Sequence, residues 1–344
     1  MKSLMHYSNT AIYSVEHRVP DDIIRTDDLE TQLAPAMRRF GYGQHLLSTL
    51  TGINQRRHWK QDVKSCAIAI EVGRAAIKSA GIDRGEVGVL INTTILRDHL
   101  EPADASFIHM GIGLGHHCIN FDIGNACLSF INGMQIVANM IEREQIKFGL
   151  IVCAENTRVL FDNTMAQMVH PDCPEEIFRR NFATLTLGSG AAAMVLGQAD
   201  KNPQMPRIKH SHAMSNTDSA NLCYLKSVSE GLYTDMSPLL KEGLALFTRN
   251  FSAGKEMSAW NETQMNWLVP HLISRTALEQ LARLLQIDIQ KIIHIFPEYG
   301  NIATASIPAA LSIARSANTF KKGDQILLGG SGSGLNSMII DVTW

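Results

Sequence analysis

The sequence predicts an α/β protein built from two halves of the same architecture. Short apolar runs, many of them rich in valine and isoleucine, alternate with segments of helical periodicity along the 344 residues. The same order of elements then occurs a second time, without visible sequence repetition. Runs that are apolar throughout are typical of strands buried on both faces. We therefore expect open parallel or mixed sheets with helices packed against them.

The first half supplies three predicted strands separated by helices. Gly81 follows the first helical segment, as is common at a helix C-terminus. The predicted order is helix 67–79, strand 87–94, a helix from 103, strand 118–123, helix 127–144 and strand 148–154.

The second half repeats that order. Pro308 inside its last helix predicts a kink or a late start, because proline removes a backbone donor. The predicted order is helix 236–250, strand 265–269, helix 274–285, strand 292–296, helix 302–317 and strand 325–328, with further strands at 191–196 and 338–342.

The chain divides most simply into residues 1–200 and residues 201–344. Residues 155–235 have no counterpart in the repeat apart from strand 191–196, and we expect most of them to form a cap over the site and part of an interface.

Composition excludes several function classes. The net charge is −2 and 45% of the residues are hydrophobic, so neither nucleic acid nor an anionic membrane is an expected partner. The densest basic cluster, Arg56-Arg57-His58 with Lys60, is expected to be a solvated face. No apolar run approaches the roughly 18–20 residues of a membrane span.

Cysteine usage points to a reduced, cytoplasmic protein. The six cysteines form no C-x-x-C motif, and no secretory leader is visible. His116-His117-Cys118 lacks a second ligand pair at suitable spacing, so no metal is expected. No cofactor is predicted either.

Three short stretches, far apart in sequence, supply candidate catalytic groups. Cys127 and Asn301 each follow a predicted strand and open a helix, in equivalent places of the two halves, while His271 ends the strand equivalent to 87–94. Chemistry in such sheets gathers at the carboxyl ends of the strands. A helix N-terminus favours a thiolate, so we expect a lowered pKa for Cys127 and a role in carrying an acyl group. The alternative is a buried structural cysteine, which we assign to the other five.

The motifs resemble the thiolase superfamily and, within it, ketoacyl-ACP synthase III. The similarity is greatest to the olefin-biosynthesis enzymes that join two fatty acyl-CoA molecules without decarboxylation, and it extends from about residue 10 to Trp344. It implies a thiolase-like fold with five layers, α-β-α-β-α, and a homodimer. The stretches that carry it are Thr51-Gly52-Ile53 with Arg56-Arg57, Leu90–Thr93, Arg97–Pro102, Asn125–Met134, Gly188–Ala193 and Gly332–Asn336.

The resemblance also implies roles for residues. His271 and Asn301 would donate hydrogen bonds to an enolate oxygen, and His271 would lie near enough to assist Cys127. Gly332-Ser333-Gly334 lacks the features of a phosphate loop, and is expected to form a tight turn whose Ser333 N–H joins the Cys127 N–H in an oxyanion hole.

Glu101 separates two kinds of condensation. Joining two plain acyl thioesters requires removal of an α-proton, and in the olefin-type enzymes the matching glutamate acts across the dimer interface. The alternative is a glutamate stabilised at a helix start, before Pro102.

The stretch Leu46–Leu50 lacks the tryptophan and arginine with which housekeeping synthases grip CoA, so an acyl carrier protein (ACP) is a possible carrier beside acyl-CoA.

Three functions follow from these residues. The first is an acyltransferase that joins two fatty acyl-CoA molecules by Claisen condensation through an acyl-cysteine. The second is a decarboxylative 3-oxoacyl-ACP synthase III, which uses acyl-CoA and malonyl-ACP. The third is a non-catalytic, acyl-binding partner of an active relative.

Overall fold

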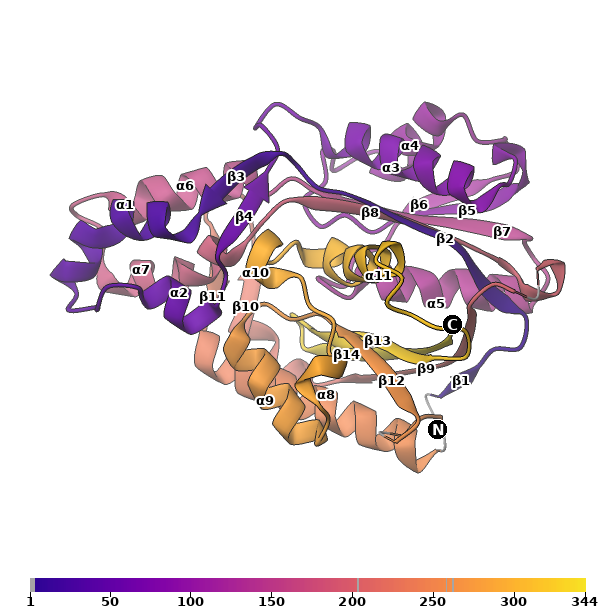
Figure 1. The fold of residues 1–344 in the computed structure, drawn as a ribbon. Helices are drawn as coiled ribbons and strands as arrows, with labels where there is room; N and C mark the ends of the chain where they lie inside the picture. Colours follow the sequence, from indigo (N-terminus) through magenta and orange to yellow (C-terminus); the bar gives the residue numbers. More distant parts are fainter. Residues whose placement is uncertain (1–3, 203, 258, 262) are drawn as a thin grey trace.

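The computed structural model describes residues 4–344 except 203, 258 and 262, and it confirms the duplicated α/β architecture (Figure 1). In the first half, β5 (Val87–Asn92) lies parallel to β6 (Ile119–Asp122) on one side and to β7 (Phe148–Glu155) on the other. β8 (Gly190–Gln198) is antiparallel to β7, and β2 (Thr10–Arg18) is antiparallel to β8.

The second half repeats this strand order. β12 (Met265–Pro270) lies parallel to β13 (Gln325–Gly332), β14 (Asn336–Thr343) is antiparallel to β13, and β9 (Arg207–Ser215) is antiparallel to β14. Thus β12, β13, β14 and β9 correspond to β5, β7, β8 and β2. The two sets meet where β2 pairs with β9, and β1 (Met5–His6) also pairs with β9.

The predicted strand at 292–296 is wrong. Ile292 forms only an isolated bridge with Leu268, and the chain then enters the short helix α10 (Phe296–Tyr299). Pro297 falls in the first turn of that helix, where its fixed φ suits a helix and its missing N–H is not needed. The second half therefore has no counterpart of the edge strand β6 among the described residues.

The helices complete five layers, as the resemblance implied. α3 and α4 cover the outer face of the first strand set, α5 and α11 lie between the two sets, and α8 and α9 cover the outer face of the second (Figure 1). Their bounds are α3 Ser65–Ala80, α4 Asp104–Ile112, α5 Ser129–Glu142, α8 Met236–Glu256, α9 Arg275–Leu285 and α11 Ser306–Ser316.

The central layer ties the halves together. Buried side chains recur along α5 at helical spacing, from Phe130 and Met134 to Val137 and Ile141, and they share one apolar cluster with residues of α11 and of both strand sets. Burying a side chain of this size contributes about 1.5–3 kcal/mol. Pro308 is the third residue of α11, which begins late, after a 3-10 turn.

A lateral unit projects from the layers on one side (Figure 1). It has its own apolar core, to which Leu29, Leu33, Phe161 and Phe178 contribute. The cap expected from residues 155–235 is therefore only part of this unit, because residues 26–51 complete it. Its helices are α1 Thr26–Arg39, α2 Leu46–Thr51, α6 Arg158–Val169 and α7 Glu175–Asn181. Beside them lie two antiparallel strand pairs, β3 Asp22–Arg25 with β4 Gln55–His58 and β10 Cys223–Leu225 with β11 Leu232–Thr234.

Two further expectations on residues 50–235 need correction. Residues 155–235 also hold β9, whose alternating polar and apolar residues hid it from a search for continuous apolar runs. The basic cluster at 56–60 is not a solvated face, because Arg56 and His58 are fully buried.

The proposed boundary between residues 200 and 201 falls in the connection from β8 to β9, and it stays a prediction. Among the described helices, none has the length and apolar character needed to cross a membrane.

Candidate active site

The three predicted catalytic residues meet at one cavity. Cys127, His271 and Asn301 all line a space of about 590 Å³, together with the turn Gly332–Gly334. The rest of the wall is largely apolar and comes from both halves and from the β10–β11 hairpin. Among the described wall residues are Leu160, Leu187, Leu225, Leu232, Leu239, Leu240, Leu244, Phe247 and Leu281.

Cys127 projects from a sharp turn between β6 and α5. Ala126, the residue before it, has a left-handed backbone with φ +47°. The turn is held by the Ser129 hydroxyl, which accepts from the Asn125 N–H at 2.6 Å and donates to the Ala126 carbonyl at 2.8 Å. Helix α5 begins at Ser129 and not at Cys127, two residues later than predicted.

The expected lowered pKa of Cys127 is wrong for the resting protein. Burial raises the pKa of this thiol to about 12, the Cys223 thiol and the Glu155 carboxylate add to the rise, and the Cys127 N–H opposes it more weakly. A helix N-terminus typically contributes about 0.3–1 kcal/mol, which is less than one pKa unit. Desolvation of an anion is the larger effect. Cys127 therefore rests as a thiol.

His271 follows β12 and is fixed by the neighbouring strand β13. Its N–H donates to the Gly329 carbonyl at 2.9 Å, and a Cβ on Gly330 would lie 2.9 Å from the His271 Cβ, so glycine is required there. Burial lowers the pKa of His271 to about 4, which keeps the imidazole neutral at pH 7. Its buried Nδ1 has no hydrogen-bond partner among the described residues, so the tautomer with the proton on Nε2 is the one that leaves no buried N–H unpaired.

Asn301 occupies a turn like that of Cys127. Gly300 before it has φ +67°, as Ala126 has a positive φ before Cys127. The Asn301 N–H donates to the Thr186 carbonyl at 2.7 Å, and its side-chain oxygen accepts from the Ala303 N–H at 2.9 Å. Because the oxygen is engaged, the side-chain NH₂ is left as the donor for the cavity.

The glycine-rich turn approaches the backbone of the nucleophile. A Cβ added to Gly332 would lie 3.6 Å from the Cys127 nitrogen and 3.1 Å from the Leu128 Cγ. Ser333 lines the same cavity. This arrangement is compatible with an oxyanion hole formed by the Cys127 and Ser333 N–H groups, which stays a prediction.

Glu155 was missed by the sequence reasoning. It is fully buried at the end of β7, lines the cavity, and accepts hydrogen bonds from the Ile95 N–H at 3.0 Å and the Thr304 hydroxyl at 2.5 Å. Burial raises the pKa of its carboxyl. A lone glutamate that ends a strand of apolar residues was the available signal, because such a charge needs dedicated partners.

Glu101 lies elsewhere. Its loop starts at the cavity wall with Ile95 and Leu96, but Glu101 itself is exposed and does not line the cavity of its own chain. Its neighbour Leu100 is 95% exposed. The structure therefore brings together three of the four predicted side chains.

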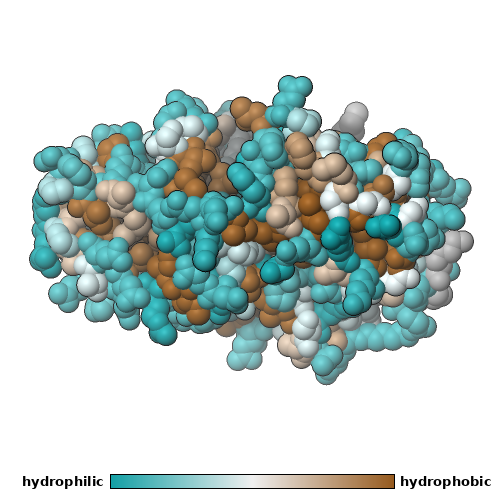
Figure 2. Space-filling view, turned by 90° about the horizontal axis from the view of Figure 1, so that it is seen from above, coloured by the Kyte–Doolittle hydropathy of each residue, from teal (hydrophilic) through white to brown (hydrophobic). Residues whose placement is uncertain are grey.

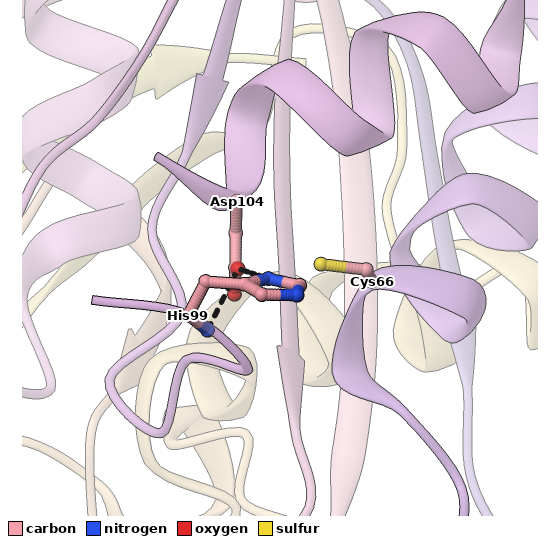
Figure 3. Close-up of side chains that lie close together, drawn as sticks. All are labelled: Cys66, His99 and Asp104. Atoms are coloured by element: carbon pink, nitrogen blue, oxygen red, sulfur yellow. Dashed lines mark hydrogen bonds and ion pairs between the residues drawn. The ribbon is translucent and has the colours of Figure 1, made fainter. Parts of the chain in front are cut away.

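Potential metal ligands gather outside the cavity. Cys66, His99 and Asp104 offer ligand atoms within 4.8 Å of one another (Figure 3). His99 Nδ1 already bonds Asp104 Oδ1 at 2.7 Å. A second group, Asp27 with Glu30 and His45, lies in the lateral unit. Neither group belongs to the wall of the described cavity, and the absence of a metal stays a prediction.

Comparison with known proteins agrees with this geometry. Residues 121–217 match the 3-oxoacyl-ACP synthase III family, and residues 256–344 match the C-terminal family of the same synthase. An acyl-CoA:acyl-CoA alkyltransferase of Xanthomonas campestris is 37% identical over 99% of this chain and 100% of its own length.

The chain belongs to the OleA family of acyl-CoA:acyl-CoA alkyltransferases. A Shewanella oneidensis member is 31% identical, with 99% of this chain and 100% of that protein covered. The fold matches a crystal structure of Xanthomonas campestris OleA with a TM-score of 0.96, over 99% of this chain and 98% of the other. A ketoacyl-ACP synthase III of Neisseria meningitidis is more distant, at 26% identity over 84% of this chain and 87% of its own. The protein is thus an acyltransferase of the thiolase superfamily.

Proposed function

We propose that this protein joins two fatty acyl-CoA molecules into a β-keto product without decarboxylation. The observation that carries the proposal is an apolar cavity lined by Cys127, a neutral His271 and the Asn301 amide. Apolar walls suit alkyl chains, and two neutral donors suit an enolate oxygen. A structure of OleA with bound lauric acid and lauroyl-CoA, similar at a TM-score of 0.95, supports this class of substrate.

The first half-reaction loads Cys127. The sulfur attacks the thioester carbonyl of one acyl-CoA, the C–S bond to CoA breaks, and the thiol proton ends on the departing CoA sulfur. The oxyanion of the tetrahedral intermediate accepts hydrogen bonds from the Cys127 and Ser333 N–H groups. Each such donor typically contributes about 3–4 kcal/mol to a step of this kind.

The second half-reaction forms the carbon–carbon bond. A base removes an α-proton from a second acyl thioester, and the enolate oxygen accepts from His271 Nε2 and the Asn301 amide. The α-carbon attacks the acyl-Cys127 carbonyl, the C–S bond to Cys127 breaks, and the sulfur regains a proton. The product is a β-ketoacyl-CoA, and water hydrolyses its thioester to the β-keto acid and free CoA. A histidine held neutral by burial suits this donor role, because its Nε2–H is present throughout the neutral pH range.

We assign the α-proton base to Glu101 of a second copy of the chain. Glu101 is exposed and does not line its own cavity, whereas β6 is an edge strand whose outer side pairs with no described strand. Leu100, Met110 and Ile119, around this edge, are exposed by 95%, 72% and 51%. Hydrophobic side chains also break up the hydrophilic surface over the face seen from above, where α3 and α4 lie (Figure 2). A symmetric, cytoplasmic homodimer formed along β6 would cover such an edge.

Decarboxylative synthesis with malonyl-ACP is the second candidate, because both matched families describe synthase III enzymes. In that reaction Glu101 would have only a structural role, and ACP would be a partner. A non-catalytic, acyl-binding role is the third, and acylation of Cys127 would exclude it.

The proposal is tested with myristoyl-CoA as the only substrate. Intact-protein mass spectrometry should show an acyl adduct that is absent from Cys127→Ala, and extraction should give a β-keto acid or its derived ketone. An adduct without product until malonyl-ACP is added would establish the synthase III reaction instead.

The assignment of Glu101 has its own test. Cys127→Ala and Glu101→Gln should each be inactive in condensation, but heterodimers formed by mixing and refolding them should recover about a quarter of the wild-type activity, since half of the dimers contain one complete site. No recovery, with heterodimers demonstrated by mass, would place Glu101 outside the partner's site.

A further inference from the structure

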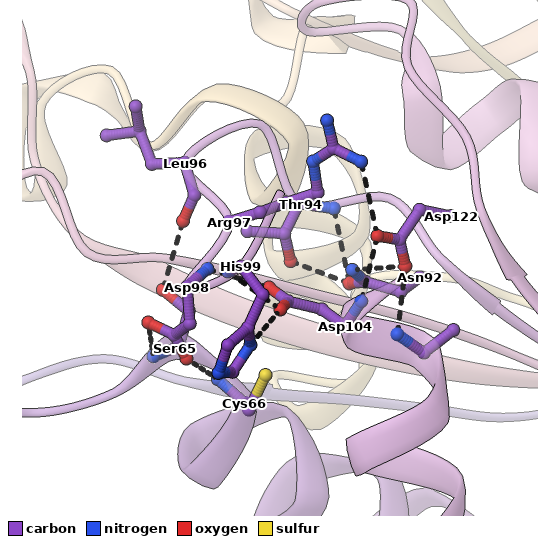
Figure 4. A network of polar contacts seen from close by, with 11 residues as sticks. Ser65, Cys66, Asn92, Thr94, Leu96, Arg97, Asp98, His99, Asp104 and Asp122 are labelled. Carbon is purple, nitrogen blue, oxygen red and sulfur yellow. Dashed lines mark hydrogen bonds and ion pairs between the residues drawn. The ribbon is translucent and has the colours of Figure 1, made fainter. Parts of the chain in front are cut away.

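The loop that carries Glu101 is held by the carboxylates of Asp98, Asp104 and Asp122 (Figure 4). Asp122, at the end of β6, accepts from the Asp104 N–H at 3.0 Å, the Ala105 N–H at 2.9 Å and the Asn92 side chain at 3.0 Å. Asp98 accepts from the Cys66 N–H at 2.8 Å, at the start of α3. The loop is therefore tied to the first turns of both outer helices, α3 and α4.

Asp104 closes the loop on itself. Its carboxylate is 1% exposed and accepts from the Asp98 N–H at 2.8 Å, the His99 N–H at 3.1 Å and the His99 ring at 2.7 Å. Leu100 and Glu101 form the tip of the loop. These contacts join Asp104, which follows the tip, to the two residues that precede it. Figure 3 shows the His99 ring reaching Asp104 while the Cys66 sulfur lies beside them.

The hydrogen bonds to Asp104 require a side chain that accepts at both of its terminal atoms. Both of its oxygens accept from backbone N–H groups, and Oδ1 also accepts from the ring. Asparagine has the same shape as aspartate, but its NH₂ group would replace one of the two oxygens. That NH₂ would face a donor N–H, so at least one of these hydrogen bonds would be lost. A hydrogen bond to a charged group of this kind typically contributes about 1.5–3 kcal/mol. The stacking of His99 on Phe107, with centroids 4.3 Å apart, would survive the change.

We propose that Asp104 is the positioning residue for Glu101. Its hydrogen bonds hold the exposed tip in the conformation in which Glu101 enters the cavity of a second copy of the chain. This inference rests on the proposed function, in which Glu101 removes the α-proton. Holding a base in place before substrate arrives spares the cost of ordering it in the transition state.

The same cluster is better explained by hydrogen bonds than by a thiol or metal function. Burial and the nearby carboxylates of Asp104 and Asp98 raise the pKa of Cys66, which keeps the sulfur protonated and unreactive. His99 uses Nδ1 for Asp104, as a ring oriented by a carboxylate does. Cys66→Ala therefore serves as a matched control, since it removes the third member of the cluster and leaves the loop closure intact.

The test separates the two half-reactions in the full-length protein. Asp104→Asn should keep the rate of Cys127 acylation by myristoyl-CoA within about threefold of wild type, because Asp104 does not line the cavity. The same substitution should lower the rate of condensation by about 100-fold, which is the typical contribution of a general base. His99→Phe should give a smaller loss of condensation. Cys66→Ala should match wild type in both steps.

Three outcomes overturn the proposal. If Asp104→Asn loses acylation and condensation equally, its role is general stability, and the melting temperature should fall with both. If Asp104→Asn condenses like wild type, the loop needs no such closure. If Cys66→Ala loses as much condensation as Asp104→Asn, the cluster acts as a thiol or metal site, which elemental analysis of the purified protein would then identify.

Failure of the proposed function has a different signature. In that case wild-type protein itself forms no product from myristoyl-CoA alone, and Glu101→Gln matches wild type when malonyl-ACP is supplied. The positioning proposal fails separately, when wild type condenses two acyl-CoA molecules, Glu101→Gln does not, and Asp104→Asn is unaffected.

Discussion

Alkylation of Cys127 should become about tenfold faster with each pH unit and should show no plateau below about pH 10. Burial raises the pKa of this thiol to about 12, so the thiolate fraction at pH 7 is roughly 10⁻⁵. A free cysteine with a pKa near 8.5 is ionised to a few per cent at that pH, or about 10³·⁵-fold more. The nucleophilicity of a thiolate rises with its pKa, with a Brønsted slope of about 0.4–0.5, so the Cys127 thiolate should react about 10¹·⁵-fold faster than that of a free cysteine. The net expectation is alkylation about 100-fold slower than that of glutathione.

The assay is a rate profile with iodoacetamide from about pH 6 to about pH 10, read at the peptide level so that the other five cysteines are followed separately. Glutathione and the denatured protein supply the free-thiol reference, which should level off near pH 9. His271→Ala should leave the profile of Cys127 unchanged, since the neutral ring forms no ion pair with the thiolate.

The reasoning would be refuted if the rate of Cys127 alkylation levelled off above about pH 7, or if His271→Ala slowed this alkylation strongly. Either result would mean that a thiolate–imidazolium pair exists in the resting protein, as the position before a helix first suggested. The acylation step would then begin from a preformed thiolate.

Three further predictions concern the cavity and its supports. Asn301→Ala should lower condensation by about 10²–10³ while Cys127 acylation, followed by mass spectrometry, stays within about tenfold, because the amide donates to the enolate only; equal losses in both steps would contradict that role. Gly188→Ala should lower the free energy of unfolding, measured by chemical denaturation, by about 1–3 kcal/mol or more, because the added Cβ would lie 2.1 Å from the Tyr299 carbonyl oxygen. If the variant is as stable as the wild type, the backbone before Asn301 can shift to make room for the methyl group. Gly243→Leu adds bulk to the cavity wall where the nearest obstacle, the Ser331 Cβ, lies 3.7 Å away, so kcat/KM for myristoyl-CoA should fall about tenfold or more relative to octanoyl-CoA; an unchanged ratio would show that the acyl chain lies elsewhere.

The sequence predicted the meeting of Cys127, His271 and Asn301 for a structural reason. Each follows a strand-like segment in a duplicated order, and a fold that repeats strand order brings equivalent turns to the same end of the molecule. The repeat itself was visible in the apolar runs. It failed at 292–296, where Pro297 in a short helix replaced the expected edge strand.

What the sequence could not predict depends on burial by distant segments. The raised pKa of Cys127 comes from its burial and from Cys223 and Glu155, which lie far from it in sequence. Residues 26–51 join the lateral unit through side chains such as Leu29 and Leu33, which no local pattern connects to α6 and α7. The closure of the Glu101 loop by Asp104 likewise depends on hydrogen bonds that periodicity does not encode.

The measurement that tests the central claim most directly is condensation of an equal mixture of unlabelled and uniformly ¹³C-labelled myristoyl-CoA, without malonyl-ACP. Our account predicts that the β-keto acid or its ketone appears as light, mixed and heavy species. The mixed β-keto acid contains carbon from one complete light and one complete heavy chain, and the mixed ketone lacks only the carboxyl carbon of the chain that supplied the α-carbon. Our account also predicts that Cys127→Ala and Glu101→Gln give none of these species. Absence of any mixed product, with product appearing only after malonyl-ACP is supplied and carrying carbon from a single myristoyl chain, would contradict the account.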